Sequence, residues 1–114
     1  MMPGEIKVEF HVSVYFNDED DIFPYISVEN PERDIVDLIS PNQIVISMKE
    51  IRIEYDYALN RRTIKFFKAD NEAGFTRIEL ARKICEGYQE ESRDLLLHTV
   101  QQIEGNLFGL TFDS

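Results

Sequence analysis

Hydrophobic and polar residues alternate without a break over residues 5–16, the clearest pattern in the chain. Ile6, Phe10 and Phe16 belong to the apolar parity, and the other parity is polar or amphipathic. A period of two places alternate side chains on opposite faces of a strand, whereas a helix would scatter the apolar ones around its circumference. The pattern therefore predicts one long strand with a buried face.

The next segment contains breaks and short apolar stretches. The acidic residues 17–21 predict a solvated turn. Residues 22–28 predict an edge strand or an extended loop, because Pro24 cannot donate to a ladder. Asn30 before Pro31 predicts the start of a short helix.

Two β-rich segments, residues 43–57 and 63–68, predict a hairpin. The apolar parity in the first of these segments changes near Lys49 and Glu50. A one-residue slip would turn a buried face to water, so we expect a bulge or a tight bend there.

Residues 75–80 have the signature of a helix start. Thr76 as N-cap can accept from the amide of Glu79, and the Glu79 carboxylate can accept from the amide of Thr76. Phe75 and Leu80 flank this pair at the spacing of a hydrophobic staple. Apolar residues at helical spacing follow, so the pattern predicts a helix beginning at residue 77.

The apolar stripe becomes polar around residues 89–94 and then resumes. The helical region is expected to cover 77–104, as one helix or as two with Ser92 capping the second. Gly105 is interpreted as its C-terminal stop. Residues 107–112 are expected to add a strand or to pack over the core.

Together these elements predict an α+β fold in a single domain, residues 1–114. We expect an antiparallel sheet of about four strands, with a long C-terminal helix or two consecutive helices packed on one face. The predicted core consists of Phe10, Val12, Val14, Ile53, Phe66, Leu80, Ile84 and Tyr88.

The stretch from residue 55 to residue 89 resembles a group of small viral and eukaryotic proteins whose function is not known. The resemblance lies in the sequence Gly-Phe-Thr-Arg-Ile-Glu-Leu at residues 74–80, preceded by two strands. It covers about a third of the chain and implies a fold rather than an activity.

The formal net charge is −10 over 114 residues, and it is unevenly distributed. Residues 61–83 hold seven basic and three acidic residues, a local balance of +4, so the remainder sums to −14. Most of this surface would repel a nucleic-acid backbone, which needs a cationic face. The basic stretch could instead contact a protein partner. The expected partner-binding residues are Arg61, Arg62, Lys65 and Lys68.

Further sequence features restrict the compartment. A single cysteine, Cys85, cannot form an internal disulfide, which favours a reducing cytoplasm or nucleus. No apolar run has the roughly 20 residues of a membrane span, and no signal peptide is expected at the N-terminus.

The search for chemistry gives one candidate. No nucleotide-binding, phosphate-loop or serine-nucleophile motif is present, and no His or Cys pair has zinc-finger spacing. We therefore expect no catalytic residues, metal or cofactor. The amides that open the predicted helix, together with Thr76 and Arg77, could form an anion-binding site.

These observations favour a non-catalytic interaction or regulatory module that binds another protein or a second copy of itself. Two alternatives stay open. One is an acidic inhibitor or nucleic-acid mimic, and the other is a small enzyme or ligand-binding domain that uses the anion site at Thr76.

Overall fold

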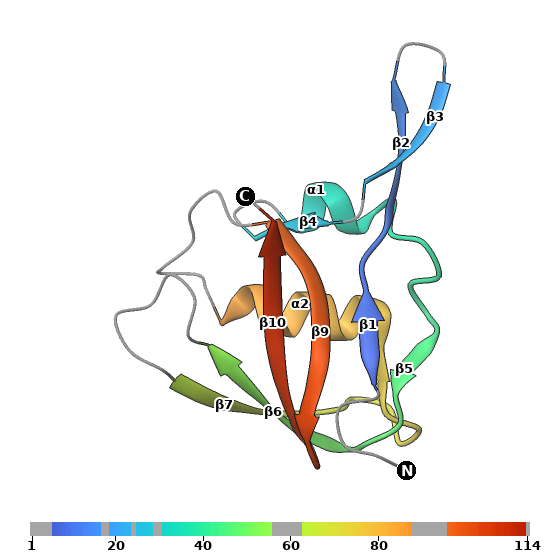
Figure 1. Cartoon of the computed structure of the whole chain (residues 1–114). Helices are drawn as coiled ribbons and strands as arrows, with labels where there is room; N and C mark the ends of the chain where they lie inside the picture. The colour runs from blue at the N-terminus through green and yellow to red at the C-terminus, as the bar shows by residue number, and fades with distance from the viewer. Residues whose placement is uncertain are drawn as a thin grey trace.

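The computed structural model of this chain describes residues 6–16, 19–23, 25–28, 31–55, 63–87 and 96–113. Most of these residues are in strands, and two short helices accompany them (Figure 1). The strands are β1 (Lys7–Glu9), β2 (Val12–Phe16), β3 (Glu19–Phe23), β4 (Ile26–Ser27), β5 (Ile44–Ile46), β6 (Glu50–Tyr55), β7 (Thr63–Lys68), β8 (Phe75–Thr76), β9 (Leu96–Glu104) and β10 (Leu107–Asp113). The helices are α1 (Pro31–Ile35) and α2 (Arg77–Glu86).

The main sheet has six strands and is mixed. Its order is β1-β9-β10-β6-β7, and β4 also pairs with β9. Strand β10 runs parallel to β6, while the other pairs in this sheet are antiparallel. The C-terminal strand therefore lies in the middle of the sheet and joins its two halves (Figure 1).

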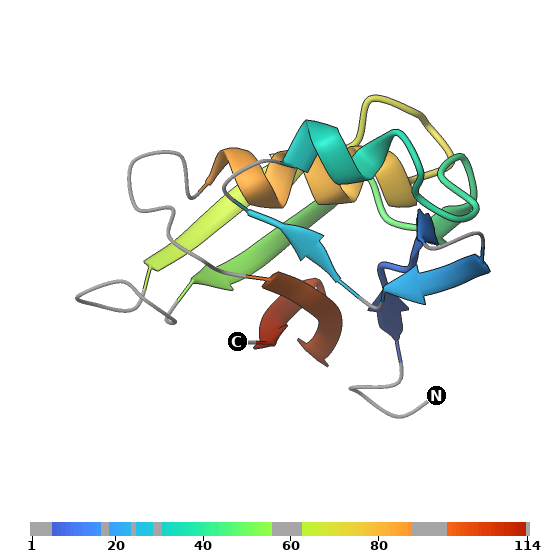
Figure 2. The ribbon, with the colours of Figure 1, turned by 90° about the horizontal axis from the view of Figure 1, so that it is seen from above.

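Both helices lie on the same side of β6 and β7 (Figure 2). An exposed ion pair between Arg82 of α2 and Glu32 of α1, at 3.1 Å, connects them. The hydroxyl of Tyr55 donates to the carbonyl of Ile84 at 3.0 Å and ties β6 to α2. The largest fully buried side chains, which mark the centre of the core, are Tyr55, Phe10, Phe75, Phe108, Ile26, Ile46, Ile51, Ile53, Leu80, Ile84 and Leu97.

The predicted helical region 77–104 is wrong beyond residue 86. Helix α2 ends at Glu86, and residues 96–104 form β9. β9 pairs with β10 through a two-residue turn at Gly105 and Asn106, since Glu104 lies opposite Leu107. Gly105 has φ 56°, the left-handed conformation that such a hairpin turn requires, so it is a turn residue and not a helix stop. Ser92, the proposed second cap, lies outside the described residues.

The predicted fold class is therefore corrected. The sheet is mixed and larger than four strands, and among the described residues the helix that follows β8 is only α2, which ends at Glu86, while residues 96–104 form a strand. The expectation that residues 107–112 add a strand is confirmed, because they form most of β10.

The single long strand predicted over residues 5–16 is divided in two within the described part, residues 6–16. Strand β1 pairs with β9 in the main sheet, and β2 pairs with β3 in a separate two-stranded sheet. Between these strands the chain turns to meet residues 37–39: the amide of Ile39 donates to the carbonyl of His11 at 2.9 Å. The burial of Phe10 and Val12 is confirmed. β3 begins at Glu19, so the predicted acidic turn extends less far than residue 21.

The change of parity near Lys49 separates two strands that belong to different sheets. β5 pairs with β8, and β6 pairs with β7 in the predicted hairpin, which is confirmed. Gly74, with φ 126°, brings the chain against β5 so closely that a Cβ there would collide with the carbonyl oxygen of Ile46. The close approach explains why only glycine fits at this entry to α2.

Most of the predicted core is confirmed, with one error. Five of its members are buried, whereas Phe66 is 74% exposed on β7. The side chain of Val14 and the whole of Tyr88 lie outside what the structure describes. The confirmed members are Phe10, Val12, Ile53, Leu80 and Ile84.

Candidate functional site

Strand β7 is an edge of the main sheet. It pairs with β6 on one side, and in the part of the chain that the structure describes no strand pairs with its other side. The amide of Ala69 donates to the carbonyl of Lys49 at 2.7 Å, so these two residues form a hydrogen-bonded pair at the end of the ladder. Hydrogen-bonded and non-hydrogen-bonded pairs alternate along an antiparallel ladder. The backbone groups of Ile64, Phe66 and Lys68 therefore point away from β6, toward the open edge.

The side chains of the same three residues lie on the face of β7 that is turned away from α2. Ile51, Ile53 and Tyr55 of β6 are buried on the α2 side, and their partners on β7 have the odd numbers 67, 65 and 63. The even-numbered residues are consequently on the opposite face. We call Ile64, Phe66 and Lys68, with their outward backbone groups, the β7 surface.

The β7 surface is apolar at its centre. Phe66 is 74% exposed and Ile64 is 39% exposed, although both are large hydrophobic side chains. A hollow of about 420 Å³ beside the strand is lined by Phe66 and its neighbours Phe67, Lys68 and Glu50. An exposed edge that also presents apolar side chains is a feature that proteins usually avoid, because it templates pairing with another chain.

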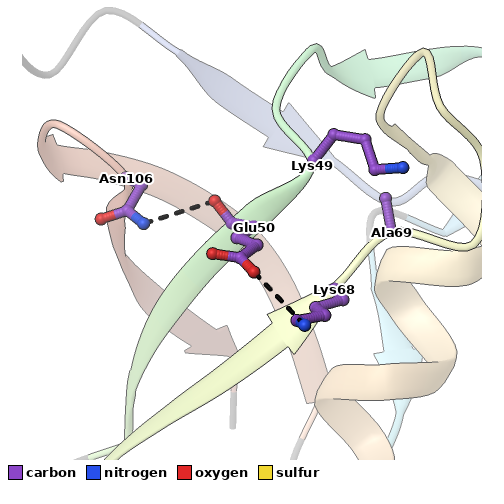
Figure 3. A pocket seen from close by; sticks show the side chains of 5 residues that line it. All are labelled: Lys49, Glu50, Lys68, Ala69 and Asn106. Atoms are coloured by element: carbon purple, nitrogen blue, oxygen red, sulfur yellow. Dashed lines mark hydrogen bonds and ion pairs between the residues drawn. The ribbon is translucent and has the colours of Figure 1, made fainter.

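The C-terminal end of the β7 surface is polar (Figure 3). An open hollow of about 520 Å³ is lined there by Lys49, Glu50, Lys68, Ala69 and Asn106. Lys68 lies 3.6 Å from the Glu50 carboxylate, and the Asn106 amide donates to the Glu50 carbonyl at 3.3 Å. Figure 3 shows Lys49 extending away from this ion pair; because Lys49 pairs with Ala69, it lies on the α2 face, whereas Lys68 lies on the opposite face.

Lys65, one of the four predicted partner-binding residues, lies on the α2 face instead. Its ammonium group donates to the carbonyl of Gly87, the C-cap of α2, at 2.9 Å. It also lies 5.2 Å from the centre of the Tyr55 ring, within range of a cation–π interaction. Lys65 and Lys68 are thus on opposite faces of one strand. Arg61 and Arg62 lie outside the described residues, directly before β7 in sequence.

The predicted anion-binding residues are engaged with the protein itself. Thr76 caps α2 as expected and accepts from the Glu79 amide at 3.2 Å. The amide of Arg77 donates to the Gln43 carbonyl at 3.0 Å, and the next amide, that of Ile78, donates to the Pro41 carbonyl at 2.9 Å. The first amides of α2 therefore already have acceptors.

The Arg77 guanidinium is also occupied by protein oxygens. It donates to the carbonyls of Glu9 at 3.0 Å and Ser40 at 2.9 Å, and to Oε1 of Gln43 at 3.0 Å. These contacts connect the end of β1 with the loop before β5. Arg77 thus holds three segments of the chain together, and the geometry does not favour it as an anion ligand.

The Glu79 carboxylate, expected to complete a reciprocal cap, accepts from the Asp70 amide at 2.7 Å. It also lies 3.7 Å from Lys83 one turn later in the helix. Glu79 therefore connects the loop at Asp70, before α2, to the helix by a hydrogen bond.

Cys85 is a free cysteine and is buried on α2. Burial raises the pKa of its thiol to about 12, and the nearby carboxylates of Asp34, Glu32 and Glu86 act in the same direction. The thiol is protonated at neutral pH and is a poor nucleophile.

Two searches of the described residues are negative. No group of three or more His, Cys, Asp or Glu side chains within residues 6–113 that the structure describes could hold a metal ion. Neither described helix has the length and hydrophobicity needed to cross a bilayer.

The sequence did not reveal the β7 surface. Residues 63–68 alternate weakly, and Phe66 and Phe67 are adjacent, so either parity could have faced the core. Which of the two parities faces the core depends on the pairing with β6 and on the position of α2. The remaining guide was the high density of basic residues around β7.

Comparison of this chain with protein-family models, with curated proteins and with solved structures gives no match in any of the three.

Proposed function

We propose that this chain is a non-catalytic interaction module that binds an extended segment of another protein along the open edge of β7. The observation that carries the proposal is the coincidence of outward-facing backbone groups with the exposed side chains of Ile64 and Phe66 on one strand. A segment that adds to a sheet edge gains main-chain hydrogen bonds, and alternate side chains supply specificity.

Exposed hydrophobic area supports this assignment. Isolated apolar side chains on a surface need no explanation, but here two of them lie on the same face of an open edge strand, next to the position that an added strand would take. Burying a Phe side chain on binding contributes roughly 1.5–3 kcal/mol. Phe66 is therefore the expected anchor, with Ile64 beside it.

Charge supports an acidic partner segment. Residues 61–68 include four basic side chains and no acidic one, in a chain whose net charge is −10. Complementary charges align a partner and reject wrong ones. A carboxylate on the partner could be received by the exposed ammonium group of Lys68, beside Glu50.

Selection of peptides tests the proposal. A library of random peptides is selected on the full chain, and the enriched peptides are measured against three variants. Phe66→Pro removes the outward amide and the ring without touching a hydrogen-bonded pair of the β6–β7 ladder. Phe66→Ala removes only the ring, and Val36→Ala removes a side chain that is 76% exposed elsewhere.

We expect enriched peptides to alternate apolar and acidic residues. Their affinity should fall about tenfold or more with Phe66→Pro, equivalent to at least 1.4 kcal/mol, fall less with Phe66→Ala, and stay unchanged with Val36→Ala. Enrichment of no peptide, or equal affinity for wild type and Phe66→Pro with both correctly folded, would refute the proposal.

The two alternatives from the sequence receive less support. The ligand-binding alternative relied on the start of α2, where the amides of Arg77 and Ile78 and the Arg77 side chain are engaged by protein oxygens. The acidic mimic requires a spaced ridge of carboxylates, and no measurement on the described residues favours it. It stays a prediction.

A further inference from the structure

A hairpin of β2 and β3 projects from the rest of the molecule (Figure 1). Its two strands form a sheet of their own, with Val12 opposite Phe23 and Val14 opposite Asp21. On β3, Ile22 is 55% exposed and Phe23 is 40% exposed. The hairpin is thus a second place where strand backbone and apolar side chains meet solvent together.

The outer edge of β3 can be identified from the contacts of β2. The amide of Ser13 donates to the Asp37 carbonyl at 2.9 Å, so the backbone hydrogen-bonding groups of Ser13 point away from β3. Ile22 lies opposite Ser13, and Asp20 lies opposite Tyr15. Because hydrogen-bonded and non-hydrogen-bonded pairs alternate along an antiparallel ladder, the backbone groups of Ile22 and Asp20 point toward the outer edge of β3.

No described residue on another element pairs with that edge. The amide of Ile22 donates to the Asp21 carboxylate next to it, at 2.8 Å, in an exposed contact. The carbonyl of an added strand can replace this local contact. The other edge of the hairpin is partly occupied, because residues 37–39 bond to the chain at the start of β2.

The two open edges have opposite charge. β3 has the sequence Glu-Asp-Asp-Ile-Phe, whereas β7 has the sequence Thr-Ile-Lys-Phe-Phe-Lys and follows Arg61 and Arg62. Two β7 strands side by side, or two β3 strands, would bring like charges together. Pairing of β3 with β7 brings acidic residues next to basic ones, and such cross-strand pairs are favourable.

We infer that β3 of one copy adds to the β7 edge of a second copy, so that the chain associates with itself head to tail. This inference rests on the proposed function of the β7 surface, and it names the partner. Ile22 and Phe66 are the apolar residues brought into contact. Asp20 and Asp21 lie opposite the Lys65–Lys68 segment.

The position of the two edges determines the symmetry. In both Figure 1 and Figure 2, the hairpin and β7 lie at opposite ends of the molecule. One contact then leaves an unused hairpin on one copy and an unused β7 on the other. A head-to-tail contact of this kind produces open chains or rings rather than a closed twofold dimer.

Light scattering after size exclusion, over a series of concentrations, tests the inference. The wild type should exceed the 13.4 kDa of one chain increasingly as concentration rises. Ile22→Pro removes the outward amide of β3, and Phe66→Pro removes that of β7. Each variant alone should remain at the mass of one chain, whereas Val36→Ala should behave as wild type.

The decisive measurement is a mixture of the two proline variants. Ile22→Pro retains an intact β7, and Phe66→Pro retains an intact hairpin, so together they should form a pair of twice the chain mass and nothing larger. Circular dichroism must show that both variants are folded. Asp20→Lys and Lys68→Glu, at positions of the same parity as Ile22 and Phe66, repeat the experiment without proline: each should weaken association, and their combination in one chain should restore it.

Either of two results would overturn the inference. The first is a wild type that stays at 13.4 kDa up to about 1 mM, since a constant weaker than that corresponds to less than roughly 4 kcal/mol. The second is an associating wild type whose two proline variants do not combine. If the wild type is monomeric while peptide binding still depends on Phe66, the self-association is refuted and the proposed function stands.

Discussion

Lys65 and Lys68 are expected to have different tasks although they lie three residues apart on β7. Lys65 donates to the C-cap carbonyl of α2 at Gly87 and lies against the Tyr55 ring. Lys68 has a side chain that is 81% exposed and a 3.6 Å contact with Glu50, itself 60% exposed. Replacing each lysine by methionine removes the charge and retains most of the aliphatic stem.

The magnitudes follow from these contacts. A charged hydrogen bond to a carbonyl at a helix C-terminus contributes about 1 kcal/mol, and a partly buried cation–π contact adds roughly 0.5–1 kcal/mol. Lys65→Met should therefore reduce the free energy of unfolding by about 1–2 kcal/mol. An exposed ion pair contributes about 0–0.5 kcal/mol, so Lys68→Met should leave stability nearly unchanged.

Urea unfolding followed by circular dichroism measures the difference. With a slope of about 1.5 kcal/mol per molar urea, the midpoint should move by roughly 1 M for Lys65→Met and by little for Lys68→Met. Binding of the selected peptides should show the reverse order, with Lys68→Met the weaker binder. Equal stabilities for the two variants would refute the assignment of Lys65 to the helix.

Three further predictions concern the core. Tyr55→Phe should cost about 1 kcal/mol in urea unfolding and no more, because the Ile84 carbonyl that loses the hydroxyl still accepts from the Gly87 amide at 3.1 Å; a loss above 3 kcal/mol would contradict this. Burial raises the pKa of the Cys85 thiol from 9.0 to about 12. The stability that the buried thiol contributes to the folded state is therefore complete below pH 9.0 and is lost as pH rises toward 12. Between pH 8 and 10.5 the wild type should lose about 2 kcal/mol more stability than Cys85→Ala, and parallel pH profiles would refute this. Gly74→Ala should lower stability by more than about 2 kcal/mol, since φ is 126° and the new Cβ meets the Ile46 carbonyl; an unchanged melting temperature would exclude that contact.

Local chemistry made the start of α2 predictable from the sequence. Thr76 caps the helix, and its hydroxyl needs only the amide three residues later, so the contact is encoded within a few residues. The β6–β7 hairpin is predictable for the same reason, because its strands are close in sequence and share an alternating pattern. α1 begins at Pro31 as the Asn-Pro sequence indicates, and it is short, ending at Ile35.

The C-terminal third was misinterpreted because its apolar residues fit two periods. Leu96, Val100 and Ile103 have helical spacing, yet the buried residues of the strand are Leu97, Thr99 and Val100, and Ile103 is exposed. The Gly105-Asn106 pair was the local signal for a two-residue hairpin, and it was interpreted as the end of a helix.

The candidate site was only partly predictable. The basic residues marked the correct strand, but their division between two faces depends on which side of β7 meets α2. Whether β7 is an edge depends on the sheet order, which joins strands separated by about half of the chain. Neither property is contained in the local sequence, so the error at Phe66 has a physical cause.

The parallel pairing of β10 with β6 has a consequence for how the chain acquires its structure. Strand β10 connects the β1–β9 half of the sheet to the β6–β7 half. β1 pairs with β9, which lies more than eighty residues later in the sequence. Contacts between such distant residues make folding slow, because a long loop must close first. During synthesis the β6–β7 hairpin would emerge early, but β6 would lack its second neighbouring strand until residues 107–113 leave the ribosome. A chain that stops before Leu107 would contain two fragments of the sheet that no strand connects, although it has about nine-tenths of these 114 residues.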